Sequence, residues 1–220
     1  MGLFYLGATA TMKVLLIAFT RWHVEGKENV PRRGPLIIVS NHLSVVDPPL
    51  LSASIPRRIE FMAKQELFEP RLMGFVVRSY GAFPIRRGQL DRAAMRRALD
   101  GLRSGLVLGM FPEGKRSPNA RLQSAQLGAS LLAGRSGVPV LPVGITGSEQ
   151  VRGRGFILRR PRITVNIGRP FSLPTVSEGS TRDRLTQHSD LMMERIAELL
   201  PQRYREPDAV QGGSGSVNGD

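Results

Sequence analysis

The stretch PLIIVSNHLSVVDPPLL, residues 35–51, contains the features that decide the fold. Its first six residues, five apolar ones and then Ser40, form a run of the length expected for a buried strand. Asn41 and His42 follow that run, and Asp47 lies near the start of a second apolar segment, 47–55, which we predict to be a short helix. A buried strand that passes through a short polar loop into a helix is the repeating unit of α/β domains.

The rest of the chain continues this alternation of strands and helices. Pro84 cannot donate a hydrogen bond to a ladder, so we expect the strand at 81–87 to lie at an edge or end of the sheet. The sequence predicts a single α/β domain with a central, mostly parallel or mixed sheet flanked by helices. Further strands are predicted at 58–63, 106–114, 138–147 and 162–168, and further helices at 70–79, 89–105, 122–137 and 181–200.

Length and composition fit one globular domain. The chain has 220 residues, of which 41% are hydrophobic and 22% are charged. We divide it into an N-terminal membrane-associating helix at 1–22, a domain at 23–204 and a disordered tail at 205–220. There is no cysteine, which excludes disulfides and thiolate nucleophiles. The three histidines are too scattered in the sequence to indicate a metal cluster, so no metal is expected.

The charge balance favours anionic partners. The chain has 31 Lys and Arg against 18 Asp and Glu, a formal net charge of +13. Such a charge attracts nucleic acid, an anionic membrane surface, or phosphorylated and CoA-like substrates, and alone it does not choose among them. Aromatic residues are only 6% of the chain and are not interleaved with basic blocks, which disfavours a stacking platform for single-stranded nucleic acid.

The N-terminal segment, 1–22, is apolar enough to interact with a membrane. No basic residue precedes Lys13, which is unlike a cleaved signal peptide. A spanning helix needs roughly 20 apolar residues, but Lys13 lies in the middle of this run. Arg21 and Trp22 end it with residue types typical of a membrane interface. We predict a helix that lies in the membrane surface, and a full span or an ordinary core helix stay open as alternatives.

Polar clusters follow four of the predicted strands, where open α/β sheets bind their ligands. The first cluster pairs His42 with Asp47. Histidine accepts protons near neutral pH, and a carboxylate against its second nitrogen fixes the tautomer and stabilises the imidazolium. No Gly-x-Ser-x-Gly motif is present, so such a base would deprotonate a substrate hydroxyl. From these residues alone, an aspartate helix cap beside a packed histidine is an equal alternative.

The second and third clusters carry cations. Arg86 and Arg87, at the end of a predicted strand, suit bidentate phosphate binding, although arginine pairs are common on so basic a chain. The segment FPEGKRS, 111–117, places a carboxylate, a glycine and two cations on one turn, and by itself it is most simply an exposed turn. The fourth cluster, residues 142–147, lies at the end of the proline-containing strand.

Taken together, these motifs resemble those of the glycerolipid acyltransferases, the lysophosphatidate acyltransferase family. NHLSVVD (41–47) is similar to the family's Asn-His-x-x-x-x-Asp motif, and GAFPIRR (81–87) to its arginine-ended second motif. FPEGKRS resembles Phe-Pro-Glu-Gly-Thr-Arg-Ser, VPVLPVGI (138–145) resembles the proline-containing fourth motif, and FMAKQEL (61–67) a Lys-x-Glu-Leu segment. The order and spacing match over about residues 20–170, and the first and third motifs are specific in combination.

The resemblance assigns roles to individual residues. It implies that His42 is the general base, that Asp47 orients it and that Arg87 binds the acceptor phosphate. Pro142 would help to form the acyl-donor pocket. Lys115 departs from the threonine that is usual at its position. Further acceptor or phosphate contacts are implied for Lys64, Glu113, Gly114, Arg116 and Ser117. Arg86 stands where relatives often have a different residue, and its predicted phosphate contact rests on its charge and its position beside Arg87.

The reaction implied by the resemblance is acyl transfer from acyl-CoA or acyl carrier protein to the free hydroxyl of a lysophospholipid, with 1-acyl-glycerol 3-phosphate as the preferred acceptor. The thioester is a co-substrate, and we expect no cofactor. Membrane lipids at the cytoplasmic face and the thioester carrier are the expected partners, without nucleic acid. Alternatives are another acceptor, such as glycerol 3-phosphate or a glycolipid, a basic nucleic-acid-binding domain, or a non-catalytic lipid-binding domain. We expect His23 to be interfacial and His188 to be solvated.

Overall fold

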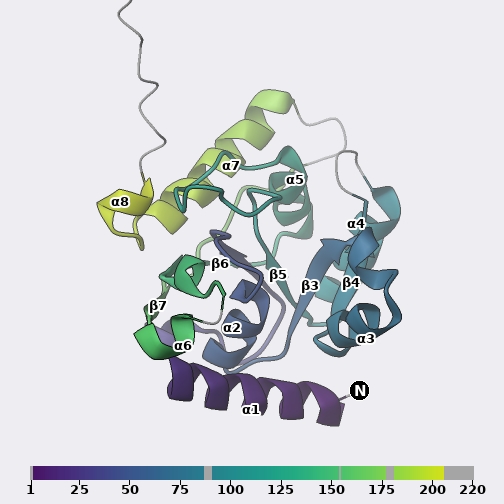
Figure 1. The fold of residues 1–220 in the computed structure, drawn as a ribbon. Helices are drawn as coiled ribbons and strands as arrows, with labels where there is room; N and C mark the ends of the chain where they lie inside the picture. Colours follow the sequence, from purple (N-terminus) through teal and green to yellow (C-terminus); the bar gives the residue numbers. More distant parts are fainter. Residues whose placement is uncertain (1, 87–90, 154, 177–180, 206–220) are drawn as a thin grey trace, which may run out of the picture.

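One mixed sheet of seven strands organises the computed structural model, which describes residues 2–86, 91–153, 155–176 and 181–205. The strand order is β1-β7-β6-β2-β5-β3-β4, and all neighbouring pairs are parallel except β6 and β7 (Figure 1). The predicted α/β fold with a mostly parallel or mixed sheet is therefore confirmed. The strands are β1 (Arg21–Glu25), β2 (Leu36–Ser40), β3 (Ile59–Lys64), β4 (Ala82–Ile85), β5 (Val107–Met110), β6 (Val140–Thr146) and β7 (Arg162–Ile167).

Helices cover both faces of the sheet. They are α1 (Gly2–Phe19), α2 (Asp47–Ser54), α3 (Arg71–Ser79), α4 (Arg92–Arg103), α5 (Leu127–Ser136), α6 (Phe156–Arg159), α7 (Arg182–Ala197) and α8 (Gln202–Arg205), with 3-10 turns η1 (Lys27–Asn29), η2 (Gln65–Phe68) and η3 (Ser148–Gln150). The crossovers through α2 and α3 advance along the sheet in one direction, and those through α4 and α5 return in the other. Because such crossovers are right-handed, the two pairs of helices lie on opposite faces (Figure 1).

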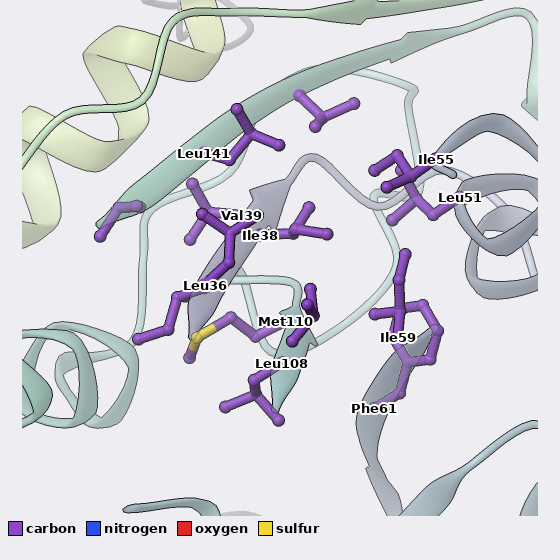
Figure 2. Close-up of a cluster of buried hydrophobic side chains, with 14 of the residues drawn as sticks. Leu36, Ile38, Val39, Leu51, Ile55, Ile59, Phe61, Leu108, Met110 and Leu141 are labelled. Carbon is purple, nitrogen blue, oxygen red and sulfur yellow. The ribbon is translucent and has the colours of Figure 1, made fainter. Parts of the chain in front are cut away.

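Strand β2 lies at the centre of the core and is buried at all of its positions. Its neighbours β5 and β6 cover both edges, and Ile37 is aligned with Leu108 on one side and Val140 on the other. A central parallel strand with both faces covered needs a continuous apolar run, and residues 35–39 supply it. Figure 2 shows side chains of β2 packed among those of β5, β6, α2 and β3, which fixes the point where the chain leaves the sheet toward His42.

Several predicted boundaries differ from the structure. The predicted helix at 1–22 ends at Phe19, because Arg21 and Trp22 belong to β1, which pairs with β7 at the edge of the sheet. The helix predicted from residue 122 begins at Leu127. The predicted edge position of the strand around Pro84 is confirmed, since β4 ends the sheet. In the predicted tail, the residues after 205 lie outside the described part of the chain.

Candidate active site

The loops that follow β2 and β5 meet at the carboxyl edge of the sheet. These strands are neighbours, with Val39 aligned with Met110. The chain leaves β2 toward α2 on one face and leaves β5 toward α5 on the other. Where neighbouring strands diverge in this way they open a crevice, which is where open α/β sheets bind ligands. The first and third predicted clusters, 41–47 and 111–117, therefore lie together.

His42 and Asp47 form a buried hydrogen-bonded pair. The His42 Nδ1 atom lies 2.8 Å from Asp47 Oδ2, and the same oxygen accepts the backbone N–H groups of Leu43 and Ser44 at 2.7 Å each. The Asp47 side chain is fully buried, whereas 11% of the His42 side chain is exposed. Because an ionised carboxylate only accepts hydrogen bonds, we assign the ring proton to Nδ1. The Nε2 atom is then the one that can accept a proton from a substrate.

Asp47 does not cap the helix that it begins. Val46 occupies the N-cap position of α2 and makes no side-chain capping bond. The carboxylate instead turns back to the loop amides of Leu43 and Ser44. The geometry therefore favours the coupled pair over the helix cap, two alternatives that the sequence left equal.

Two further contacts fix the surroundings of His42. Phe111 stacks on the imidazole ring, with ring centroids 4.0 Å apart and planes inclined by 18°. The Asn41 side chain donates to the carbonyl of Ile145 at 2.8 Å and accepts from the N–H of Ile145 at 2.7 Å. This amide pair ties the end of β2 to β6, so that His42 leaves the sheet at a defined point.

Glu113 lies behind the histidine and is buried. Its Oε1 atom accepts the backbone N–H of His42 at 2.9 Å, and its Oε2 atom accepts the backbone N–H of Gln123 at 3.2 Å. Burial raises the pKa of Glu113 to about 7, although these two hydrogen bonds act to lower it, and the charge of Asp47 adds to the rise. The resemblance places Glu113 at the acceptor site, and in the structure both of its carboxylate oxygens accept hydrogen bonds from backbone N–H groups.

The turn around Gly114 and Ser117 completes this wall of the site. Gly114 has a φ of 71°, a conformation that glycine adopts without strain. The Ser117 N–H donates to the carbonyl of His42 at 2.8 Å, and the Ser117 hydroxyl donates to Asn119 Oδ1 at 3.0 Å. The two cations of the turn, Lys115 and Arg116, are exposed as the sequence suggests, whereas Glu113 and Ser117 are buried against the histidine loop.

A cavity of about 770 Å³ opens beside the same turn. Phe111, Glu113 and Gly114 contribute to its wall, so the cavity borders the ring that stacks on His42. Its other walls combine apolar side chains with three cations and one carboxylate, that of Asp91, so positive charge is in excess, which suits an amphiphile that carries an anionic group. The apolar side chains include Met62, Ile85, Met95, Met110, Leu127, Leu131 and Leu185, and the cationic ones are Arg86, Lys115 and Arg182.

The remaining predicted site residues are not all brought to this cavity. Arg87 lies outside the described residues, so its phosphate-binding role stays a prediction. The Lys64 ammonium pairs with Glu66 at 3.0 Å, and Arg116 is exposed on the turn. Pro142 is buried within β6 beside Val39 and does not line the cavity.

Sequence reasoning missed the cavity residues on α7 and misplaced one histidine. Arg182 and Leu185 line the cavity, but the helical periodicity of their segment indicated only a packed face. His188 was expected to be solvated, and this was wrong, because it lies on the side of α7 that packs against α5 and is buried there. That burial, and then the charge of Arg184, lowers the pKa of His188. His23 is largely exposed on β1, 3.2 Å from Glu25.

Known proteins with similar sequences share one description. A family model described as Acyltransferase matches residues 21–146. The 1-acyl-sn-glycerol-3-phosphate acyltransferase of Streptococcus pneumoniae is 30% identical, over 74% of this chain and 62% of that protein. The enzyme of that name from Bacillus subtilis is 27% identical, over 86% of this chain and 92% of that protein. A chloroplastic relative from Arabidopsis thaliana, LPAT1, is 29% identical, and the chain spans about half of its length (52%).

A solved structure agrees with these matches. The crystal structure of the 1-acyl-sn-glycerophosphate (LPA) acyltransferase PlsC from Thermotoga maritima has a TM-score of 0.68 and 27% sequence identity to this chain. The alignment covers 89% of this chain and 79% of that one. The family model spans more than half of the chain, including the His42 loop and the Glu113 turn. The chain therefore belongs to the acyltransferase family.

Proposed function

We propose that this protein transfers an acyl group from acyl-CoA or acyl carrier protein to the free hydroxyl of 1-acyl-glycerol 3-phosphate, which gives phosphatidate for phospholipid synthesis. The observation that carries this proposal is the 2.8 Å contact between His42 Nδ1 and Asp47 Oδ2, next to a cavity that suits an anionic amphiphile. The names of the streptococcal and Bacillus relatives support the choice of acceptor.

In the proposed reaction, His42 is a general base. Its Nε2 atom takes the proton of the acceptor hydroxyl as the oxygen attacks the thioester carbonyl carbon, and Asp47 stabilises the imidazolium. The tetrahedral intermediate then breaks its C–S bond, and the departing thiolate receives the proton from His42. The acyl group passes directly to the acceptor, so the reaction forms no acyl-enzyme and needs no cofactor.

Cations at the cavity would bind the acceptor phosphate. Arg86 and Lys115 line the cavity, and the motif resemblance adds Arg87. A guanidinium binds phosphate through two parallel hydrogen bonds, which would hold the acceptor hydroxyl near His42. Orientation of this kind can supply up to roughly 7–11 kcal/mol of the rate enhancement. The apolar walls would receive hydrocarbon chain, and Lys64 and Arg116 would add positive charge outside the cavity.

A panel of acceptors assayed against both thioester donors tests this proposal. With lipid vesicles and 1-acyl-glycerol 3-phosphate, we expect free thiol and phosphatidate to form in equal amounts. Glycerol 3-phosphate, other lysophospholipids and a glycolipid are the competing acceptors. Turnover with one of these alone would move the assignment to that acceptor. No thiol release with any of them, together with salt-dependent DNA binding, would favour the nucleic-acid alternative.

We also propose that α1 lies in the cytoplasmic surface of a membrane rather than across it. By length and composition this helix could span a bilayer. It is, however, fastened to the domain near both ends: the Ile59 N–H donates to Tyr5 Oη at 3.2 Å, and Arg160 Nη2 donates to the carbonyl of Ile17 at 3.1 Å. A helix held in this way cannot turn into the bilayer unless it leaves the domain. Figure 1 shows α1 lying along one side of the domain, with α6 close to one of its ends.

The exposed apolar side chains of three helices support this placement. Phe4 of α1 contacts Phe75 of α3 edge to face, with ring centroids 5.1 Å apart, and α1 also contacts α6. The apolar platform is defined by Leu3, Phe4, Leu6, Val14, Leu15, Ile17, Leu72, Met73, Phe75, Val76, Ile157 and Leu158, which are all exposed. Exposed apolar surface of this extent is typical of a membrane or partner contact. The basic surface of the chain favours an anionic bilayer as that partner.

Placing a charge on both α1 and α3 should release the protein from membranes. We expect the double variant Leu6→Glu, Leu72→Glu to bind anionic vesicles more than about tenfold more weakly in a flotation assay, because it loses two exposed apolar side chains that the membrane would bury. The control, Gln187→Glu with Gln202→Glu, adds the same charge at exposed positions outside the apolar platform. Equal binding by the two double variants would show that the apolar platform is not the membrane contact.

A further inference from the structure

Both polar groups of the His42 backbone are held by the turn that follows β5. Its N–H donates to Glu113 Oε1 at 2.9 Å, and its carbonyl accepts the N–H of Ser117 at 2.8 Å. The residue that carries the base is thus fixed by a segment about seventy positions away in the sequence. The turn fixes the position of the His42 backbone, and the hydrogen bond to Asp47 fixes the orientation of the imidazole ring.

The same carboxylate also fixes the turn itself. Glu113 Oε2 accepts the N–H of Gln123 at 3.2 Å, and the N–H of Gln126 donates to the carbonyl of Pro112 at 2.8 Å. Glu113 therefore connects the loop after β2, the turn after β5 and the segment that leads to α5. The two N–H groups bond to different oxygens of Glu113, and a carboxylate is the side chain that provides two acceptor oxygens.

We infer that Glu113 is a positioning residue of the acyl-transfer site, which holds His42 through its backbone and does not bind the substrate. The inference rests on the proposed function and replaces the acceptor-binding role that the motif resemblance implied. In this role the turn at Glu113 and Gly114 positions the base, because it would keep Nε2 of His42 at a fixed distance from the acceptor hydroxyl. Misplacement of a reacting group by about 1 Å can lower the rate by roughly 100-fold.

The variant Glu113→Gln tests this inference with little change in size. Glutamine retains one acceptor oxygen, but its amide nitrogen faces a second N–H, so either His42 or Gln123 loses its partner. We expect kcat to fall about 10- to 100-fold, while the KM values for donor and acceptor stay within about threefold, because both carboxylate oxygens of Glu113 accept backbone N–H groups instead of binding substrate. The matched control is Glu149→Gln, at a carboxylate that accepts from Tyr204 Oη at 2.9 Å, and we expect it to keep wild-type activity. Thermal unfolding confirms that both variants are folded.

A second measurement reports the contact without turnover. Asn41–His42 is the only Asn-His pair in the sequence, so ¹³C-carbonyl asparagine with ¹⁵N histidine selects the His42 amide in an NMR spectrum. Because the pKa of Glu113 is raised to about 7, this amide signal should shift with pH around 7 in the wild type. The part of this shift that comes from Glu113 should be absent in Glu113→Gln, and any part that comes from other groups should remain. The ring of His42, Asp47 and the cations of the turn are the same in both proteins, so their effects cancel in the comparison.

The outcomes separate the inference from the proposed function. A kcat within threefold of the wild type for Glu113→Gln would overturn the positioning role. A large rise in the KM for the acceptor with kcat unchanged would also overturn it, because that result indicates substrate binding. If the wild type acylates no acceptor, the proposed function fails, and the amide titration still decides whether Glu113 holds His42.

Discussion

The variant His42→Ala is expected to lower kcat by about 10²- to 10⁴-fold, the usual contribution of a general base, and to leave the fold intact. The imidazole is the group that would take the acceptor proton, and its ring lies partly exposed at the crevice against Phe111. The backbone bonds to Glu113 and Ser117 do not depend on the side chain, so the loop should persist. The measurement is thiol release at saturating donor and acceptor, with circular dichroism to monitor the fold.

His23→Ala is the matched control for this experiment. His23 lies on β1 at the edge of the sheet, is largely exposed and contacts Glu25. The control should retain wild-type turnover. If His42→Ala also turned over near the wild-type rate, the proposed base would be wrong, and proton transfer would have to be assigned to another group or to water.

The parts of the site that the sequence predicted are those encoded locally. Residues 35–51 contain a strand, a polar loop and a helix in succession, and each has a period and length that can be recognised without knowledge of the rest. His42 and Asp47 are five positions apart, so a single tight loop brings them together. The edge position of the strand at Pro84 followed from one missing N–H group. The sequence therefore predicted the part of the site that a single loop forms, which is the pair of His42 and Asp47.

The parts that the sequence did not predict depend on contacts between distant segments. Residues of strand β1 are alternately exposed and half-buried, and the strand forms because it pairs with β7. The paired residues are 141 positions apart in the sequence, as in Arg21 and Arg162. Nothing in the residues around Gln123 indicates that its N–H group pairs with Glu113. The cavity takes Arg182 and Leu185 from a helix whose periodicity fits an ordinary surface helix equally well. A pattern on one element predicts that a face is buried, but not which element covers it.

The variant Asp47→Asn is expected to lower kcat by about 10²- to 10⁴-fold while the loop keeps its shape. Three donors converge on Asp47 Oδ2, namely His42 Nδ1 and the N–H groups of Leu43 and Ser44. In the variant, the amide oxygen should occupy that position, because an amide nitrogen there would face three donors. The hydrogen bonds then remain, but the negative charge that stabilises the imidazolium in the transition state is lost. The measurement is kcat with both substrates saturating, alongside thermal unfolding.

Asp47→Ala is a poorer test, because it leaves the N–H groups of Leu43 and Ser44 unpaired in the interior, at a cost of about 1–3 kcal/mol each. Its loss of activity would not distinguish catalysis from the shape of the loop. In Asp47→Asn the amide nitrogen takes the place of Oδ1, an atom with no hydrogen-bond partner among the described residues, so its own N–H groups are unpaired and lower the stability, but the N–H groups of Leu43 and Ser44 keep their acceptor. Full activity of Asp47→Asn would mean that Asp47 only holds the loop in shape and that its charge has no part in the reaction. A large loss of kcat in a variant that is still folded would mean that its charge acts on His42 during the reaction.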